Sequence, residues 1–103
     1  MGQRQRTDLH KILCDLLGSD NVYYQPPPSI KMKYPCIVYS LSYINSMYAD
    51  NSNYVDSKRY DITLIDRDPD SEYIDKLKDL PMCSFDRSYA VDGLHHTVYR
   101  LYF

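Results

Sequence analysis

Apolar and polar side chains alternate in CIVYSLSYINSMY, residues 36–48, and this pattern is the clearest indication of the fold. One side of the extended chain carries the larger apolar residues, Ile37, Tyr39, Leu41 and Tyr43. The other side carries Val38, Ser40 and Ser42. A period of two is typical of a strand with one face against a core. The sequence therefore predicts a strand here.

The same alternation returns in KRYDITLID, residues 58–66. Tyr60, Ile62 and Leu64 share one face, and the opposite face carries Arg59, Asp61 and Thr63. Between the two predicted strands lies SMYADNSNYVDS, which is rich in Asn, Asp and Ser. Such a composition favours turns, so we expect a long exposed hairpin arm over residues 45–57. A connection of this size in a small domain is commonly functional.

Apolar residues at helical spacing precede these strands: Leu9, Ile12, Leu13, Leu16 and Leu17. Asp8 suits the positive start of a helix, and Gly18 suits its end. We expect a helix from Gln5 to Leu17.

Residues 22–35, VYYQPPPSIKMKYP, begin with a possible short strand. Pro26–Pro28 remove three amide donors, so this segment cannot be a central strand. It can follow the surface or a sheet edge, and a PxxP-type ligand is the sharper but less favoured interpretation.

The C-terminal third predicts a second short helix and a hairpin. Tyr73, Ile74, Leu77 and Leu80 have helical spacing before Pro81, and two strands, residues 82–91 and 94–103, flank Asp92-Gly93. We predict a single α+β domain, 1–103, with a mainly antiparallel sheet of about four strands and two helices on one face. The expected order is α-β-β-β-α-β-β, with a short first strand.

Composition narrows the class of function. The chain has 103 residues, a net charge of −2 and no large basic patch, which argues against nucleic-acid binding driven by phosphate charge. Cys14, Cys36 and Cys83 form no Cys-x-x-Cys pair, so we expect reduced thiols. Twelve tyrosines against two phenylalanines favour, weakly, a surface that makes contacts.

The acidic stretch IDRDPDSE, residues 65–72, invites a comparison with a calcium loop. Counting from Asp66, the required glycine and the final bidentate acid are replaced by Ser71 and Leu77. The favoured interpretation is the start of a helix, with Asp68 as cap and Pro69 in the first turn. Solvated carboxylates at such a place are poorly suited to acid–base catalysis.

His95 and His96 are neighbours on a predicted strand, so their side chains point to opposite faces and cannot hold one metal together. No nucleophile elbow, glycine-rich phosphate loop or Cys–His motif is present. We therefore expect no catalytic residue, no cofactor and no metal site, and a protein that is not an enzyme.

From about Val22 onward the chain resembles the tail terminator, or tail completion, proteins of long-tailed bacteriophages. The resemblance rests on the order and spacing of Tyr34-Pro35, Tyr48-Ala49-Asp50-Asn51, Arg59-Tyr60, Asp66–Asp70, Leu80-Pro81, Phe85, Arg87-Ser88-Tyr89 and Leu94-His95-His96. The N-terminal helix matches this family only in kind.

The resemblance implies a ring, usually of six copies, that caps the tail tube, stops its polymerisation and joins the head connector or another neck protein. It implies a virion protein, assembled in the bacterial cytoplasm, with no membrane partner, through which DNA passes without specific binding. The expected contacts with a neighbour or the tube are Tyr48, Asp50, Asn51 and Tyr54, followed by Arg59 and Arg87. The alternatives are a head completion or head–tail joining protein and, in another class, a small α/β nucleic-acid-binding module.

Overall fold

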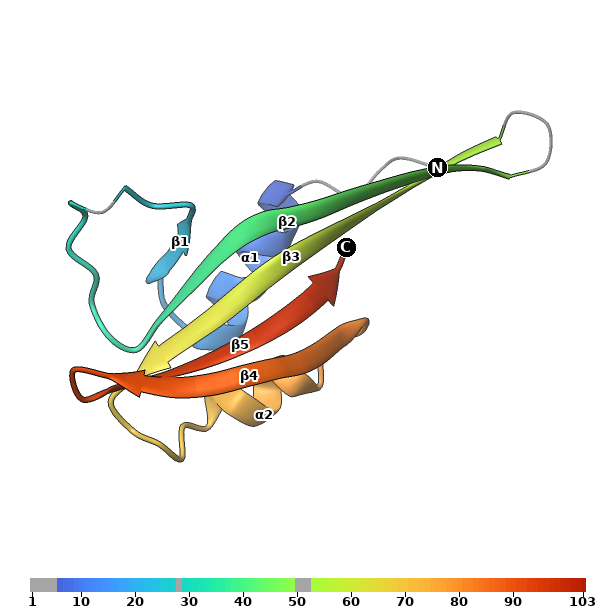
Figure 1. Ribbon diagram of the computed structural model, residues 1–103. Coiled ribbons are helices and arrows are strands. Elements are labelled where there is room, and N and C mark those ends of the chain that lie inside the picture. Colours follow the sequence, from blue (N-terminus) through green and yellow to red (C-terminus); the bar gives the residue numbers. More distant parts are fainter. Residues whose placement is uncertain (1–5, 28, 50–52) are drawn as a thin grey trace.

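A computed structural model describes residues 6–27, 29–49 and 53–103, with the backbone alone between residues 43 and 57. Along the chain the elements are α1 (Arg6–Leu17), β1 (Val22–Tyr24), β2 (Cys36–Ala49), β3 (Asn53–Asp66), α2 (Tyr73–Lys78), β4 (Cys83–Val91) and β5 (Leu94–Tyr102). They form one α+β domain with two helices and one sheet (Figure 1).

The sheet has five strands in the order β1-β2-β3-β5-β4. Three pairs are antiparallel, whereas β1 runs parallel to β2, with Val22 opposite Ile37. The predicted mainly antiparallel sheet of about four strands is thus corrected to a mixed sheet of five, in which three of the four strand pairs are antiparallel. Parallel neighbours need a crossover connection, and here the proline-rich residues 25–35 bring the chain back without a helix. β1 is an edge strand, as expected for a segment that runs almost directly into the prolines beginning at Pro26.

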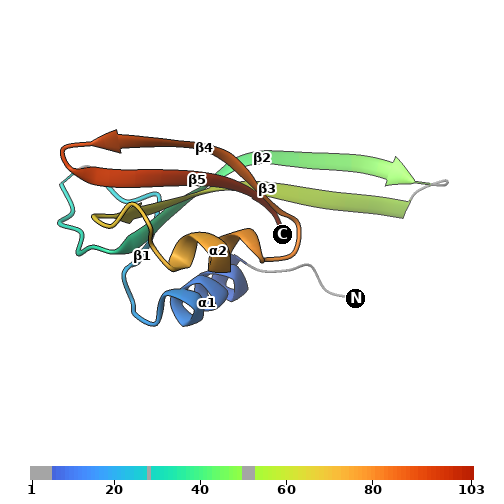
Figure 2. The same ribbon diagram turned by 90° about the horizontal axis from the view of Figure 1, so that it is seen from below.

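Both helices pack on the same face of the sheet, and no helix of the described residues covers the other face (Figure 2). The residues buried between these layers come from α1, all five strands but β4, and α2: Leu9, Leu13, Leu17, Val22, Ile37, Tyr39, Tyr60, Ile62, Leu64, Leu77, Tyr99 and Leu101. The alternation predicted for residues 37–39 and 60–64 is confirmed, because these apolar side chains line the core.

α1 ends where expected. Gly18 adopts φ +76° and its N–H donates to the carbonyl of Cys14 (2.8 Å), a left-handed helix end that suits glycine. The buried stripe is narrower than predicted, since Leu9, Leu13 and Leu17 are buried while Ile12 remains 40% exposed.

The predicted start of α2 is wrong. The helix begins at Tyr73 with Glu72 as N-cap; the Glu72 side chain makes no capping hydrogen bond, whereas Oγ of Ser71 accepts from the N–H of Tyr73 (3.3 Å). Asp66 and Asp68 instead accept hydrogen bonds from the backbone N–H groups of Asp68 (3.1 Å) and Asp70 (2.9 Å). Aspartate commonly bonds the backbone two residues on and so competes with helix formation. The acidic stretch is therefore a pair of consecutive turns that carries the chain from β3 to α2.

The hairpin between β4 and β5 turns at Asp92 (φ +53°) and Gly93 (φ +76°), as the dipeptide predicts. The β2–β3 hairpin extends far beyond the remaining strands (Figure 1). Its projection makes the molecule 52 Å long against 24 and 23 Å in the other directions.

Candidate interaction surface

The projecting part of the β2–β3 hairpin, residues 43–58, is named the arm here. Its two strands pair with each other continuously from Tyr43↔Arg59 to Ala49↔Asn53. β1 pairs with β2 only up to Tyr39, and β5 pairs with β3 only from Arg59 onward. Within the described sheet, the arm strands thus have no other strand partner. The predicted polar loop is mostly a two-stranded ladder.

The four arm residues expected to make contacts fall at its far end. Tyr48 and Tyr54 are cross-strand partners in the ladder, so the backbone places them at the same level of the arm. Asp50 and Asn51 lie outside the described residues. The contact role of all four stays a prediction.

Arg59 lies at the root of the arm, opposite Tyr102 of β5. Its Nε donates to Oγ of Ser42 (3.1 Å), and that hydroxyl donates to the Arg59 carbonyl (3.0 Å). The β2–β3 register shifts between Leu41 and Tyr43, so Ser42 is the extra residue of a bulge. The Arg59–Ser42 bonds stabilise this bulge, where the arm leaves the body of the sheet.

Arg87 lies on β4, and its Nη1 contacts Oδ2 of the adjacent Asp86 (2.5 Å). Oδ1 of Asp86 also faces Arg100 of β5 (3.4 Å). The β4–β5 register shifts between Phe85 and Arg87, which makes Asp86 a second bulge residue. Its carboxylate thus pairs with two cations within one subunit, and the side chains of Arg87 and Arg100 remain 62% and 49% exposed.

The six predicted contact residues do not form one site. Four belong to the far part of the arm, Arg59 lies at its root, and Arg87 lies on β4, which β5 separates from β3. Any joint role requires contacts between different copies or different partners. The sequence predicted a strand over residues 82–91, but it did not predict that β4 leaves large apolar side chains exposed.

β4 is the terminal strand of the sheet and pairs only with β5. It carries three exposed large apolar side chains, Phe85 (59%), Tyr89 (44%) and Val91 (48%). Tyr89 stacks on His96 with ring centroids 4.8 Å apart and an interplanar angle of 12°. Phe85 meets the buried ring of Tyr99 edge-on at 6.1 Å. Both rings are thus held in place while much of their surface faces solvent.

A hollow of about 480 Å³ lies between this strand and the segment that leads into α2. Its walls include Pro69 and Ile74 on the helix side and Phe85, Ser88 and Ala90 on β4. The other lining residues are Tyr89 of β4 and His95, His96 and Thr97 of β5. The hollow therefore lies beside the exposed side chains of β4 and has both apolar and polar walls.

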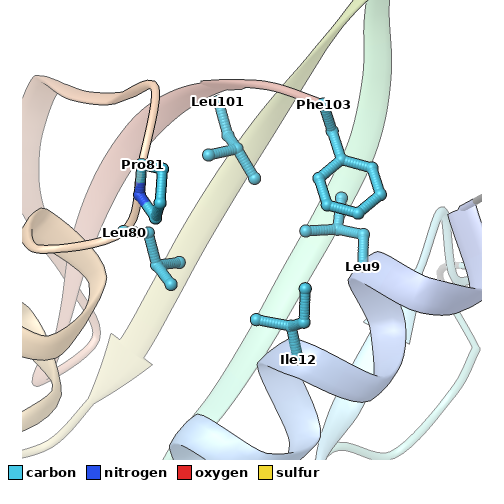
Figure 3. Close-up of a pocket in the computed structure, with 6 residues that line it drawn as sticks. All are labelled: Leu9, Ile12, Leu80, Pro81, Leu101 and Phe103. Atoms are coloured by element: carbon cyan, nitrogen blue, oxygen red, sulfur yellow. The ribbon is translucent and has the colours of Figure 1, made fainter. Parts of the chain in front are cut away.

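A second hollow, of about 300 Å³, lies between α1 and the end of the sheet (Figure 3). Its side chains are all apolar: Leu9, Ile12, Leu80, Pro81, Leu101 and Phe103. The N–H of Phe103 donates to the carbonyl of Lys58 (3.0 Å), so this hollow lies beside the root of the arm. It has no polar side chain that would orient a small ligand.

A buried tyrosine ties α1 to the sheet. The hydroxyl of Tyr39, a residue only 1% exposed, accepts a hydrogen bond from Nη1 of Arg6 (3.2 Å). Its proton is then available for Nδ1 of His10 (2.7 Å). Burial raises the pKa of Tyr39, and the Arg6 guanidinium partly opposes this effect. Tyr24 packs against the same ring at 4.9 Å and lies under Arg6.

The structure also describes the side chains that could bind a metal ion or act as nucleophiles. No group of three or more His, Cys, Asp or Glu side chains among the described residues could hold a metal ion. All three cysteines are free thiols, and burial raises the pKa of Cys36 and of Cys83 to about 11. Such thiols are protonated near neutral pH and are poor nucleophiles.

None of the described helices has the length and apolar character needed to cross a membrane. Comparison with protein-family models gives no match for this chain. Comparison with curated proteins likewise gives no significant match.

Proposed function

We propose that this protein is a structural tail terminator of a long-tailed bacteriophage. In this role it assembles as a ring, of six copies in the related family, on the end of the tail tube. The ring stops tube polymerisation and provides the surface to which the head connector or neck protein binds. DNA passes through the ring without specific binding.

The observation that carries the proposal is the arm. Its strands extend from the bulge at Ser42 beyond every other strand, on a molecule 52 Å long and about half as wide. An isolated two-stranded hairpin is at best marginally stable in water, so a long one is best explained by a partner that it contacts. The resemblance of residues 22–103 to tail terminators supports the nature of that partner.

The first test is a replacement of Met47–Val55 by Asn-Gly. Ser46 and Asp56 are cross-strand partners, so a two-residue turn can close the shortened hairpin. Because the replaced residues lie where the hairpin extends beyond every other strand, we expect the remaining sheet to fold, with a nearly unchanged thermal midpoint and a circular dichroism spectrum that loses only the strand signal of the removed ladder. The variant should no longer assemble or complete tails in extracts that contain tailless heads and unterminated tubes. Normal tail completion by this variant would contradict the role of the arm.

The second test measures assembly directly. Light scattering over a concentration series, followed by electron microscopy, should show a closed ring of uniform mass or a monomer that added tubes recruit. Binding to isolated portal-containing heads but not to tubes would instead identify a head completion or head–tail joining protein. Retardation of DNA or RNA on a gel at moderate salt would favour the nucleic-acid-binding module.

A further inference from the structure

We propose that the free edge of β4 receives the arm of a neighbouring copy as an additional strand. The inference rests on the proposed ring assembly and names the surface that closes it. Two surfaces of one chain, the arm and the β4 edge, would join in every contact.

The first argument is the state of the β4 edge. A terminal strand presents a row of backbone N–H and C=O groups that can template another strand. Proteins usually protect such an edge with lysine, proline or a very short strand. β4 has nine residues and contains neither lysine nor proline. Seven of the nine residues are exposed. Its protective features are the bulge at Asp86 and the adjacent Arg87.

The second argument is the matching edge on the arm. Residues 43–49 of β2 and 53–58 of β3 pair only with each other among the described strands. Apart from the Lys58 carbonyl, which accepts from the N–H of Phe103, each arm strand therefore leaves one row of backbone groups without a sheet partner among the described strands. At about 3.4 Å per residue, seven arm residues span about 24 Å and the nine residues of β4 about 31 Å. The whole length of one arm strand therefore fits along β4.

The third argument is charge. On the receiving side, the Asp86 carboxylate faces two cations, Arg87 and Arg100, so this part of the sheet has an excess of positive charge. The arm contains two acids, Asp50 and Asp56, and one base, Lys58. Opposite charges across an interface fix register and favour the correct partner.

The fourth argument is the symmetry of the assembly. The arm and the β4 edge are different surfaces, so their contact is head-to-tail and each copy makes it twice. A head-to-tail contact closes into a ring when the rotation permits. Pairing of β4 with β4 of another copy would be two-fold and would end at a dimer.

The experiment places a photo-reactive benzoylphenylalanine at Ala90, an exposed residue of β4. A second variant carries it at Val91, 48% exposed, in case the first does not fold. Mixed isotope-labelled and unlabelled copies are irradiated, alone and on tail tubes, and the interchain product is mapped by mass spectrometry. We expect cross-links to peptides within residues 43–58. Cross-links to residues 83–91 alone, or no interchain product in either sample, would overturn the proposal.

A pair of glutamate substitutions is tested beside a matched control pair. Ser88→Glu with Ala90→Glu puts negative charge on the β4 edge, where it opposes the acids of the arm, whereas Thr7→Glu with Ser29→Glu adds the same charge at exposed positions elsewhere. We expect the β4 pair to lower the association constant of this contact by at least about tenfold, equivalent to about 1.4 kcal/mol, and the control pair to leave it unchanged. Rings of normal mass from the β4 pair would refute this inference but would leave the proposed function unaffected. Rings cross-linked through β4 that fail to bind tubes would refute the proposed function alone.

Discussion

Replacement of Tyr39 by phenylalanine tests how α1 is held on the sheet. The ring stays in the core, so packing is preserved and only the hydroxyl is lost. That hydroxyl bonds Nδ1 of His10 at 2.7 Å and Nη1 of Arg6 at 3.2 Å. Both partners are only half-buried, so water can reach them once the hydroxyl is gone. The cost is therefore that of the bonds themselves and not of two buried orphan groups.

A net hydrogen bond contributes about 0.5–1.5 kcal/mol, and the longer bond to Arg6 belongs at the low end of this range. We expect Tyr39→Phe to lower the free energy of unfolding by about 1–2 kcal/mol. For a domain of this size the thermal midpoint should fall by roughly 5–12 °C. Urea unfolding followed by far-ultraviolet circular dichroism measures the change. An unaltered m-value would show that the unfolded state is unaffected.

Tyr102→Phe is the matched control, because this side chain is 40% exposed and its hydroxyl makes no hydrogen bond within the described part of the chain. A double-mutant cycle of Tyr39→Phe with His10→Ala should give a coupling energy of about 0.5–1.5 kcal/mol. The reasoning is refuted if Tyr39→Phe changes stability no more than the control does. A coupling energy of zero would refute the His10 bond specifically.

Two further predictions concern the turn of the β4–β5 hairpin and alkaline pH. Gly93→Ala should lower the free energy of urea unfolding by about 1 kcal/mol. Gly93 has φ +76° and a Cβ there would touch nothing within 4 Å, so the cost comes from backbone conformation alone. Asp92→Asn should be nearly neutral, and an equal loss from both substitutions would contradict this explanation. Burial raises the pKa of Tyr99 from 10.0 to about 12 and those of Cys36 and Cys83 from 9.0 to about 11, so the folded chain keeps protons that the unfolded chain releases. Since the folded state binds more protons in this range, the free energy of unfolding should be insensitive to these groups below about pH 9 and fall as the pH rises to about 12. Reversible unfolding under reducing conditions across this range measures it, and stability that stays constant to pH 12 would count against the burial of these groups.

Local signals explain most of the elements that the sequence predicted. The end of α1 follows from Gly18, the β4–β5 turn follows from Asp92-Gly93, and the core faces of β2 and β3 follow from strict alternation. Each depends on backbone preferences or on a period within one element. Such signals are fully present in a short window of sequence.

The sequence-based predictions were wrong where two local backbone preferences competed. Asp68 and Pro69 suit a helix start, but the same aspartates suit turns, and the turns prevailed because the chain must first leave β3. At Ser42 the alternation of β2 continues in the sequence, while a bulge shifts the actual register. Neither outcome can be read from one strand alone.

Local sequence patterns predict the composition of the core, the succession of helices and strands and the position of the long hairpin. They do not predict that β1 joins the sheet in parallel, that β5 separates β3 from β4, or that β4 ends the sheet with three large apolar side chains exposed. Local patterns cannot predict strand order, because strand order depends on pairing between distant segments. Periodicity identifies the buried face of a strand, but its neighbour is selected by contacts that form only when the whole chain folds.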